Sequence, residues 1–167
     1  MSSTPYVLRT DNRHFQKVTN DVTTSDADVT SVAVSTSPSG MTCKGANLAT
    51  LLPIATGNTP ADKATFFYVW GISPIADETT WLPVYIGKFK ATFGTLNGVA
   101  NGYPDDTWFF ADKIELIDGD TSCRIISSEN NTIASVTVDL AGASRLLVTY
   151  ADSGTQPTKV NCLAGLI

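Results

Sequence analysis

The sequence predicts an all-β protein: an antiparallel β-sandwich of jelly-roll type with an extended N-terminal arm. From residue 64 to the last residue, β-type runs are interrupted at short intervals by Gly, Pro, Asn or Asp, and no helical period is present. Strands without helices between them cannot form a parallel sheet, because its crossovers need about a dozen residues or more. Cys43 and Cys123 are too far apart in sequence for an antibody-type disulfide, so a jelly roll is preferred to an immunoglobulin-like sandwich.

One domain and an arm account for the chain. Its 167 residues suffice for one sizeable core and are few for two. Residues 1–28 are polar and cannot bury enough apolar surface to offset the entropy lost on ordering. We therefore expect a polar N-terminal arm over residues 1–28 and a β-sandwich domain over residues 29–167. The arm docks on a partner, is disordered or adds an edge strand, and the sequence leaves these three alternatives open.

The expected strands lie between clusters of turn-forming residues. Residues 71–77 are expected as a turn and the Gly- and Asn-rich residues 94–106 as a loop, while residues 41–54 are either a strand or an irregular segment. Two of the strands, at residues 107–117 and 121–127, are expected to form a hairpin. The full set of expected strands is 29–36, 64–72, 81–93, 107–117, 121–127, 132–140, 145–150 and 159–166.

Two runs alternate strictly enough to predict which side chains meet the core. In the longer run, Tyr85 and Phe89 fall on the expected core face, whereas Ile86, Lys88 and Lys90 fall on the opposite face. Two lysines on one face are more simply a solvated or edge-protecting feature than a ligand site. The second run places on its core face Ala134, Val136, Val138 and Leu140.

The residues that catalysis would need are scarce. Nucleophilic catalysis by Ser or Cys requires a base, nearly always His, and the only histidine, His14, lies in the polar arm. Neighbouring carboxylates at residues 105–106 and 118–120 are more simply turn and strand-end caps, and no calcium-loop spacing is present. The three cysteines lie at none of the close spacings of zinc or redox motifs. We therefore predict no enzyme activity, no cofactor and no metal.

The net charge and the composition of the first thirty residues exclude some classes of partner. The net charge is −5, and the basic residues are scattered rather than clustered, so nucleic acid is not an expected partner. The first thirty residues contain no apolar stretch of the length that a signal peptide or membrane span requires. We expect synthesis in the cytoplasm and no membrane contact.

Aromatic side chains are the remaining candidates for partner contact. Trp81, Tyr103 and Trp108 flank the segments at 73–81 and 94–107, where they would form a platform on which sugars stack. Core packing or subunit contact is the simpler alternative for these three. In the arm, Tyr6 and Phe15 are the apolar residues expected to contact a partner.

The C-terminal segment has a recognisable order of elements. Its thirty residues read VDLAGASRLLVTYADSGTQPTKVNCLAGLI. They contain a strand entering through Val138-Asp139-Leu140, a small-residue corner at Gly142, a strand at residues 146–148, a polar loop and a final Val-x-Cys-Leu-x-x-Leu-Ile strand. This segment resembles the closing segment of small capsid decoration (cement) proteins of tailed phages. The resemblance covers under a fifth of the chain and consists of hydrophobic patterning and a corner glycine.

The resemblance implies a virion structural protein on the capsid surface, made in the host cytoplasm. Such a protein would be a β-sandwich of jelly-roll type, a homo-oligomer and most simply a homotrimer, whose partner is the major capsid protein that it bridges and stabilises. The long Gly/Asn loop and the many aromatics depart from this family, so a carbohydrate- or receptor-binding module of a phage fibre is the alternative.

Overall fold

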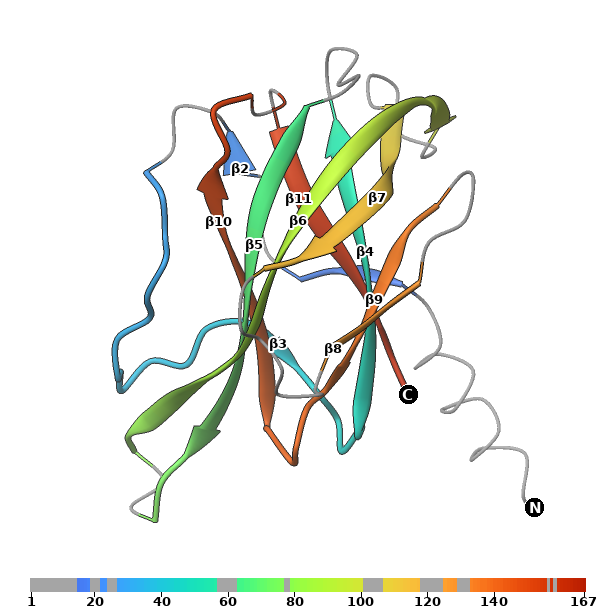
Figure 1. Cartoon of the computed structure of the whole chain (residues 1–167). Helices are drawn as coiled ribbons and strands as arrows, with labels where there is room; N and C mark the ends of the chain where they lie inside the picture. Colours follow the sequence, from blue (N-terminus) through green and yellow to red (C-terminus); the bar gives the residue numbers. More distant parts are fainter. Residues whose placement is uncertain are drawn as a thin grey trace, which may run out of the picture.

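The computed structural model describes residues 15–18, 22–23, 27–56, 63–76, 79–100, 107–117, 125–128, 133–155, 157 and 159–167. These residues form one antiparallel sheet that curls into a half-barrel (Figure 1). The all-β prediction is confirmed, and the described part of the chain has no helix that could cross a membrane. Its strands are β1 (Gln16–Lys17), β2 (Val22–Thr23), β3 (Met41–Thr42), β4 (Leu48–Thr56), β5 (Ala64–Pro74), β6 (Trp81–Ala100), β7 (Thr107–Leu116), β8 (Ile125–Ser128), β9 (Ser135–Asp139), β10 (Arg145–Asp152) and β11 (Lys159–Leu166).

The curled sheet has two walls that face each other. One, here called the β5 wall, contains β10, β5, β6 and β7, and the other, the β4 wall, contains β11, β4, β9 and β8 (Figure 1). Strand β7 joins the walls, because it pairs with β6 on one side and with the end of β4 on the other. The walls thus belong to one curled sheet, because a continuous hydrogen-bonded path connects them.

Strand β4 forks between two neighbours. Its first half pairs with β9 through residues 48–51, and its last three residues pair with β7. Leu52 and Pro53 have no Cα partner on this side, although both pair with β11 on the other. A fork is a position where a strand tolerates proline, because the ladder is already interrupted there. The ambiguous segment at 41–54 is therefore mostly strand.

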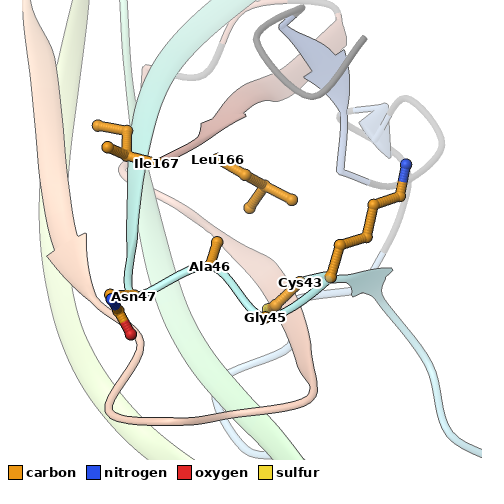
Figure 2. Close-up of a pocket in the computed structure, with 7 residues that line it drawn as sticks. Cys43, Gly45, Ala46, Asn47, Leu166 and Ile167 are labelled. Carbon is orange, nitrogen blue, oxygen red and sulfur yellow. The ribbon is translucent and has the colours of Figure 1, made fainter. Parts of the chain in front are cut away.

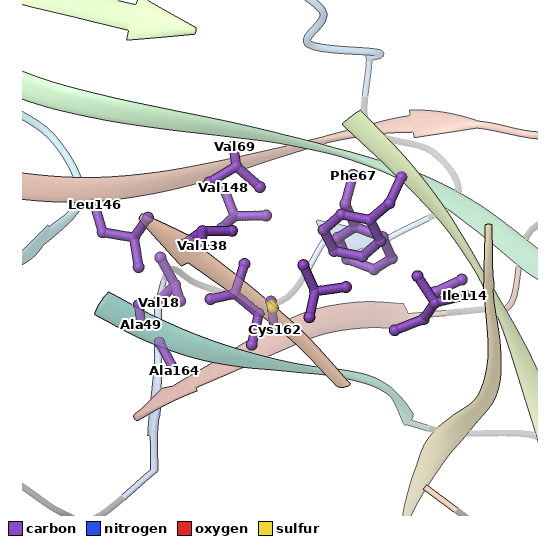
Figure 3. Close-up of a cluster of buried hydrophobic side chains, with 14 of the residues drawn as sticks. Val18, Ala49, Phe67, Val69, Ile114, Val138, Leu146, Val148, Cys162 and Ala164 are labelled. Atoms are coloured by element: carbon purple, nitrogen blue, oxygen red, sulfur yellow. The ribbon is translucent and has the colours of Figure 1, made fainter. Parts of the chain in front are cut away.

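The hydrophobic core fills the space between the walls (Figure 3). Phe67 is central: its ring stacks on Phe89 at a centroid distance of 5.2 Å and meets the edge of Tyr150 at 5.1 Å. Aromatic pairs at such distances contribute beyond the area they bury. The predicted inward face of β9 is confirmed, since its four residues are buried: Ala134, Val136, Val138 and Leu140.

A β-bulge in β6 changes the predicted faces of this strand. Val69 pairs with Gly87 and Trp70 with Tyr85, so Ile86 is an extra residue on β6. Ile86 is buried in the core, while Tyr85 is exposed on the outer face. The prediction was wrong for these two residues, because it extended a strict period of two through a position where the bulge resets it. Lys88 remains on the outer face, as predicted.

Residues 27–40 form a strap over the outside of the β5 wall instead of the predicted strand at 29–36. The Val29 N–H donates to the Tyr150 carbonyl, and Ser35 forms an isolated bridge with Trp81. Between these two points, Val32 packs on a small buried cluster of Trp70, Ile72 and Leu147. The strand prediction at 29–36 was wrong, because alternating Val and Ser or Thr do not distinguish a strand from an extended segment.

Three other local expectations were also wrong. Strand β5 continues to Pro74, so the turn expected at 71–77 begins later, and β6 continues to Ala100, so the first half of the loop expected at 94–106 is strand. Strand β8 pairs with β9 and not with β7, so the described residues 125–127 form no hairpin with residues 107–117. Residues 101–106 lie outside the described residues.

The described part of the N-terminal arm is paired with the domain. Strands β1 and β2 both add to β11, the Val18 N–H donates to the Cys162 carbonyl at 3.0 Å, and the Val18 side chain is buried in the core. Of the three alternatives for the arm, the edge strand is therefore the one observed in these residues. Residues 1–14 lie outside the described residues.

Candidate interaction surfaces

The end of the β5–β6 hairpin projects beyond the body of the sheet (Figure 1). Strand β10 pairs with β5 only as far as Ile72, and β7 pairs with β6 only from Phe89 onward. Residues 73–76 and 79–82 therefore extend past both neighbouring strands, and residues 83–85 extend past β7. The hairpin ladder, the turn bond from the Ile75 N–H to the Thr80 carbonyl and the bridge between Ser35 and Trp81 hold them. We call residues 73–76 and 79–85 the projecting hairpin.

One side of the projecting hairpin is apolar and exposed. Leu82 is 42% exposed and Val84 48%, on the face that carries Gly71 and Ser73 of the paired strand, and Ile75 at the tip is 44% exposed. Leu82 and Val84 are neighbours on one face of β6, and Ile75 is joined to Thr80 at the tip of the same hairpin. Contiguous exposed apolar groups mark contact surfaces more often than single ones do.

The outer side of the β5 wall carries aromatic rings and lysines. The Lys88 Nζ lies 4.5 Å from the centroid of the Phe66 ring and 5.0 Å from that of Tyr68, while the Lys90 Nζ lies 5.9 Å from the Phe66 centroid. Tyr85 lies on the same face of β6. Cations over ring faces are attracted by the ring quadrupole, which restricts where the ammonium groups lie.

Neighbouring groups support this outer face. The Trp70 ring meets the Tyr85 ring edge-on at 5.4 Å, and the Trp70 Nε1 donates to the Thr149 Oγ1 at 3.0 Å. On β7, Lys113 and Glu115 form an exposed ion pair of 3.0 Å. The hydrogen bond and charge of Lys113 hold the pKa of Glu115 below its usual value, with a smaller contribution from Lys90.

Of the five predicted contact residues, the structure describes the surroundings of two. Trp81 is half-buried and packs against the cluster under the strap, with its backbone bridged to Ser35, which matches the core-packing alternative. Phe15 is 47% exposed, and its ring lies against Gly165, where an added Cβ would meet it at 2.9 Å. Tyr6 and Tyr103 lie outside the described residues.

Trp108 lies on β7, beside the end of β6 that is opposite to Trp81. Its backbone pairs with Val99 and Thr56, whereas Trp81 begins β6. The backbone positions of Trp81 and Trp108 therefore lie at opposite ends of β6.

A shallow pocket of about 270 Å³ lies beside the turn that joins β3 to β4 (Figure 2). It is lined by Cys43, Lys44, Gly45, Ala46, Asn47, Leu166 and Ile167. Burial raises the pKa of the Cys43 thiol, against the opposing effect of Arg145, so the nucleophilic thiolate is disfavoured. The pocket walls contain neither a histidine nor a carboxylate side chain.

The remaining chemistry-bearing groups form no site in the described ranges. Cys43 and Cys162 are free thiols, and burial strongly raises the pKa of Cys162. Between residues 15 and 167, the described parts hold no group of three or more His, Cys, Asp or Glu that could bind a metal ion. The projecting hairpin and the outer face of β6 carry exposed apolar and aromatic side chains.

Comparisons with known proteins give no indication of what these surfaces bind. A scan against protein-family models, a search of the curated proteins and a search of the solved structures find no match.

Proposed function

We propose that the protein is a non-enzymatic virion structural protein, which decorates a phage capsid and bridges major capsid protein subunits as a homo-oligomer, most simply a trimer. The observation that carries this proposal is the projecting hairpin, on which Leu82, Val84 and Ile75 are exposed apolar side chains. A contiguous apolar surface on a β module has the character of a protein contact. The proposed location is the capsid surface, after synthesis in the host cytoplasm.

The C-terminal segment supports the same proposal. Its resemblance to decoration proteins consists of a strand, a small-residue corner, a second strand and a closing strand. In the fold these are β9, the corner at Ala141 and Gly142 with positive φ angles of 48° and 78°, β10 and β11. The jelly-roll designation belongs to this proposal as well, and the two facing walls are compatible with it.

The N-terminal arm contributes to contacts through main-chain pairing. Strands β1 and β2 add main-chain pairs to the edge of β11, with register pairs such as Gln16 to Ala164 and Val22 to Val160. We propose that residues 1–14 continue this mode of contact onto a neighbouring subunit, because strand addition supplies affinity through main-chain hydrogen bonds. A variant lacking residues 1–14 would then bind the capsid more weakly while melting at an unchanged temperature.

The experiment uses capsids of the encoding phage prepared without this protein. Co-sedimentation measures binding, calorimetry measures capsid melting, and analytical ultracentrifugation measures the oligomeric state of the free protein. The variant Leu82→Thr with Val84→Thr removes the apolar surface and keeps strand-forming residues. The control is Leu116→Thr, which changes a side chain of similar exposure, 41%, on β7.

The wild-type protein is expected to raise the capsid melting temperature, and the double variant to bind about tenfold more weakly, which corresponds to roughly 1.4 kcal/mol. Leu116→Thr should bind like the wild type. Absence of capsid binding by the wild type would overturn the function. Equal loss in the control and in the double variant would remove the hairpin from the mechanism.

A carbohydrate- or receptor-binding module of a phage fibre is the second candidate. The exposed Tyr85 ring beside Lys88 and Lys90 favours it, because aromatic faces and ammonium groups together suit a polar, extended ligand. The two candidates use opposite faces of β6, since Leu82 and Val84 alternate with Tyr85 along the strand.

A further inference from the structure

The β6 bulge places an aromatic residue in line with two lysines. Without an extra residue, Tyr85 and Lys88 would point to opposite faces of the strand, because their spacing is odd. The bulge at Ile86 turns Tyr85 outward, so Tyr85, Lys88 and Lys90 follow one another along a single face. Bulges commonly re-aim a side chain at functional positions. We call these three residues the Tyr–Lys row.

The side chains of the Tyr–Lys row are held in place from below. Tyr85 is 46% exposed and rests edge-on against Trp70, which is buried and hydrogen-bonded to Thr149. Lys88 lies between the rings of Phe66 and Tyr68. A contact surface that is already ordered loses less conformational entropy when it binds a ligand.

From this arrangement we infer that the Tyr–Lys row binds an acidic polysaccharide with carboxylated sugar units. The apolar face of a sugar ring would stack on the exposed Tyr85 ring, and the carboxylates would accept charge-assisted hydrogen bonds from the Lys88 and Lys90 ammonium groups. Tyr85 to Lys90 corresponds to the four-residue distance from Trp70 to Phe66 on β5, about 13 Å at roughly 3.3 Å per residue, which suits successive units of a polymer.

A carbohydrate fits this face better than an acidic protein does. Protein contacts centre on apolar surface, and the exposed aliphatic residues of β6, Leu82 and Val84, lie on the opposite side. The aromatic neighbours of the row, Phe66, Tyr68 and Trp70, are half-buried or buried. A copy held to a capsid through that apolar side would keep the Tyr–Lys row accessible. The inference stands without the capsid proposal, because its test uses the isolated protein.

The test is isothermal titration of the full-length protein with a galacturonic acid hexamer, with an uncharged glucose hexamer as the neutral counterpart. The variant Lys88→Glu with Lys90→Glu reverses both charges of the row. Its control is Lys44→Glu with Lys159→Glu, which changes the net charge equally through exposed lysines outside the row. Tyr85→Ala tests the stacking contact, and thermal melting of each variant verifies folding.

The wild type is expected to bind the acidic hexamer, with affinity falling at least fivefold between 50 mM and 500 mM salt. Lys88→Glu with Lys90→Glu should weaken binding at least tenfold and Tyr85→Ala about fivefold, while the Lys44/Lys159 control stays within twofold. No binding of the acidic hexamer by the wild type would overturn the inference, as would equal loss in the control. A hexaglutamate peptide that binds as tightly would also overturn it, in favour of an acidic protein partner.

Discussion

A substitution at Gly40 should be far more damaging than the same substitution at Gly154. Both glycines have a left-handed backbone, with φ angles of 90° and 92°. A Cβ at Gly154 would meet nothing within 4 Å. A Cβ at Gly40 would overlap the carbonyl oxygen of Leu146 and lie 2.9 Å from the carbonyl carbon. The pair therefore separates steric conflict from backbone strain.

The magnitudes follow from these two contributions. Gly154→Ala should cost about 1–2 kcal/mol, the usual penalty of a left-handed conformation for a residue with a Cβ. Gly40→Ala carries the same penalty and about 1–3 kcal/mol more for overpacking against a backbone that cannot move independently. The carbonyl of Gly40 also accepts a 2.7 Å hydrogen bond from Arg145, which a shift of the strap would weaken.

Urea unfolding at equilibrium and thermal melting measure the difference. A chain of this length should lose roughly 2–4 °C of melting temperature per kcal/mol. We expect a loss of about 2–8 °C for Gly154→Ala and a further loss of about 2–12 °C for Gly40→Ala. Equal losses in the two variants would refute the close approach of the strap to β10 on which the reasoning rests.

Three further predictions concern burial and pairing. Thr149→Val should cost about 1–3 kcal/mol in urea unfolding, because it leaves the Trp70 Nε1 without an acceptor in a buried position, and Thr149→Ser should retain the bond. Cys43 and Cys162 should not react with a disulfide reagent in the folded protein at pH 8, because burial raises the pKa of both thiols. Both should react after denaturation, and peptide mapping of the labelled chain identifies them. Deleting residues 1–28 should lower the melting temperature measurably, because it removes β1, β2 and a buried valine from the domain; an unchanged melting temperature would mean that these pairs contribute nothing.

Local alternation predicted several elements well. The strand at residues 159–166 coincides with β11, and the strand at residues 145–150 is the greater part of β10. The buried face of β9 was predicted as well, since side chains of a half-buried strand alternate and its sequence does so without interruption.

The candidate surfaces could be predicted less well, because they depend on positions where alternation is interrupted. Tyr85 was assigned to the core, and only the pairing of Val69 with Gly87 and of Trp70 with Tyr85 shows otherwise. Whether the residues near Trp81 pack or protrude depends on where β10 and β7 end, and neither endpoint is encoded in the sequence of the hairpin itself. The shared face of Lys88 and Lys90 was predictable, since no bulge lies between them.

The amino-acid sequence by itself determined the β class, the core face of β9 and the scarcity of catalytic groups, because these follow from composition and from the two-residue period of an extended chain. Only the tertiary structure decided that β8 pairs with β9, that residues 27–40 form a strap, and that Tyr85 lies beside Lys88. Strand partners are chosen by contacts between residues far apart in the chain, and a single bulged residue reverses every side chain before it.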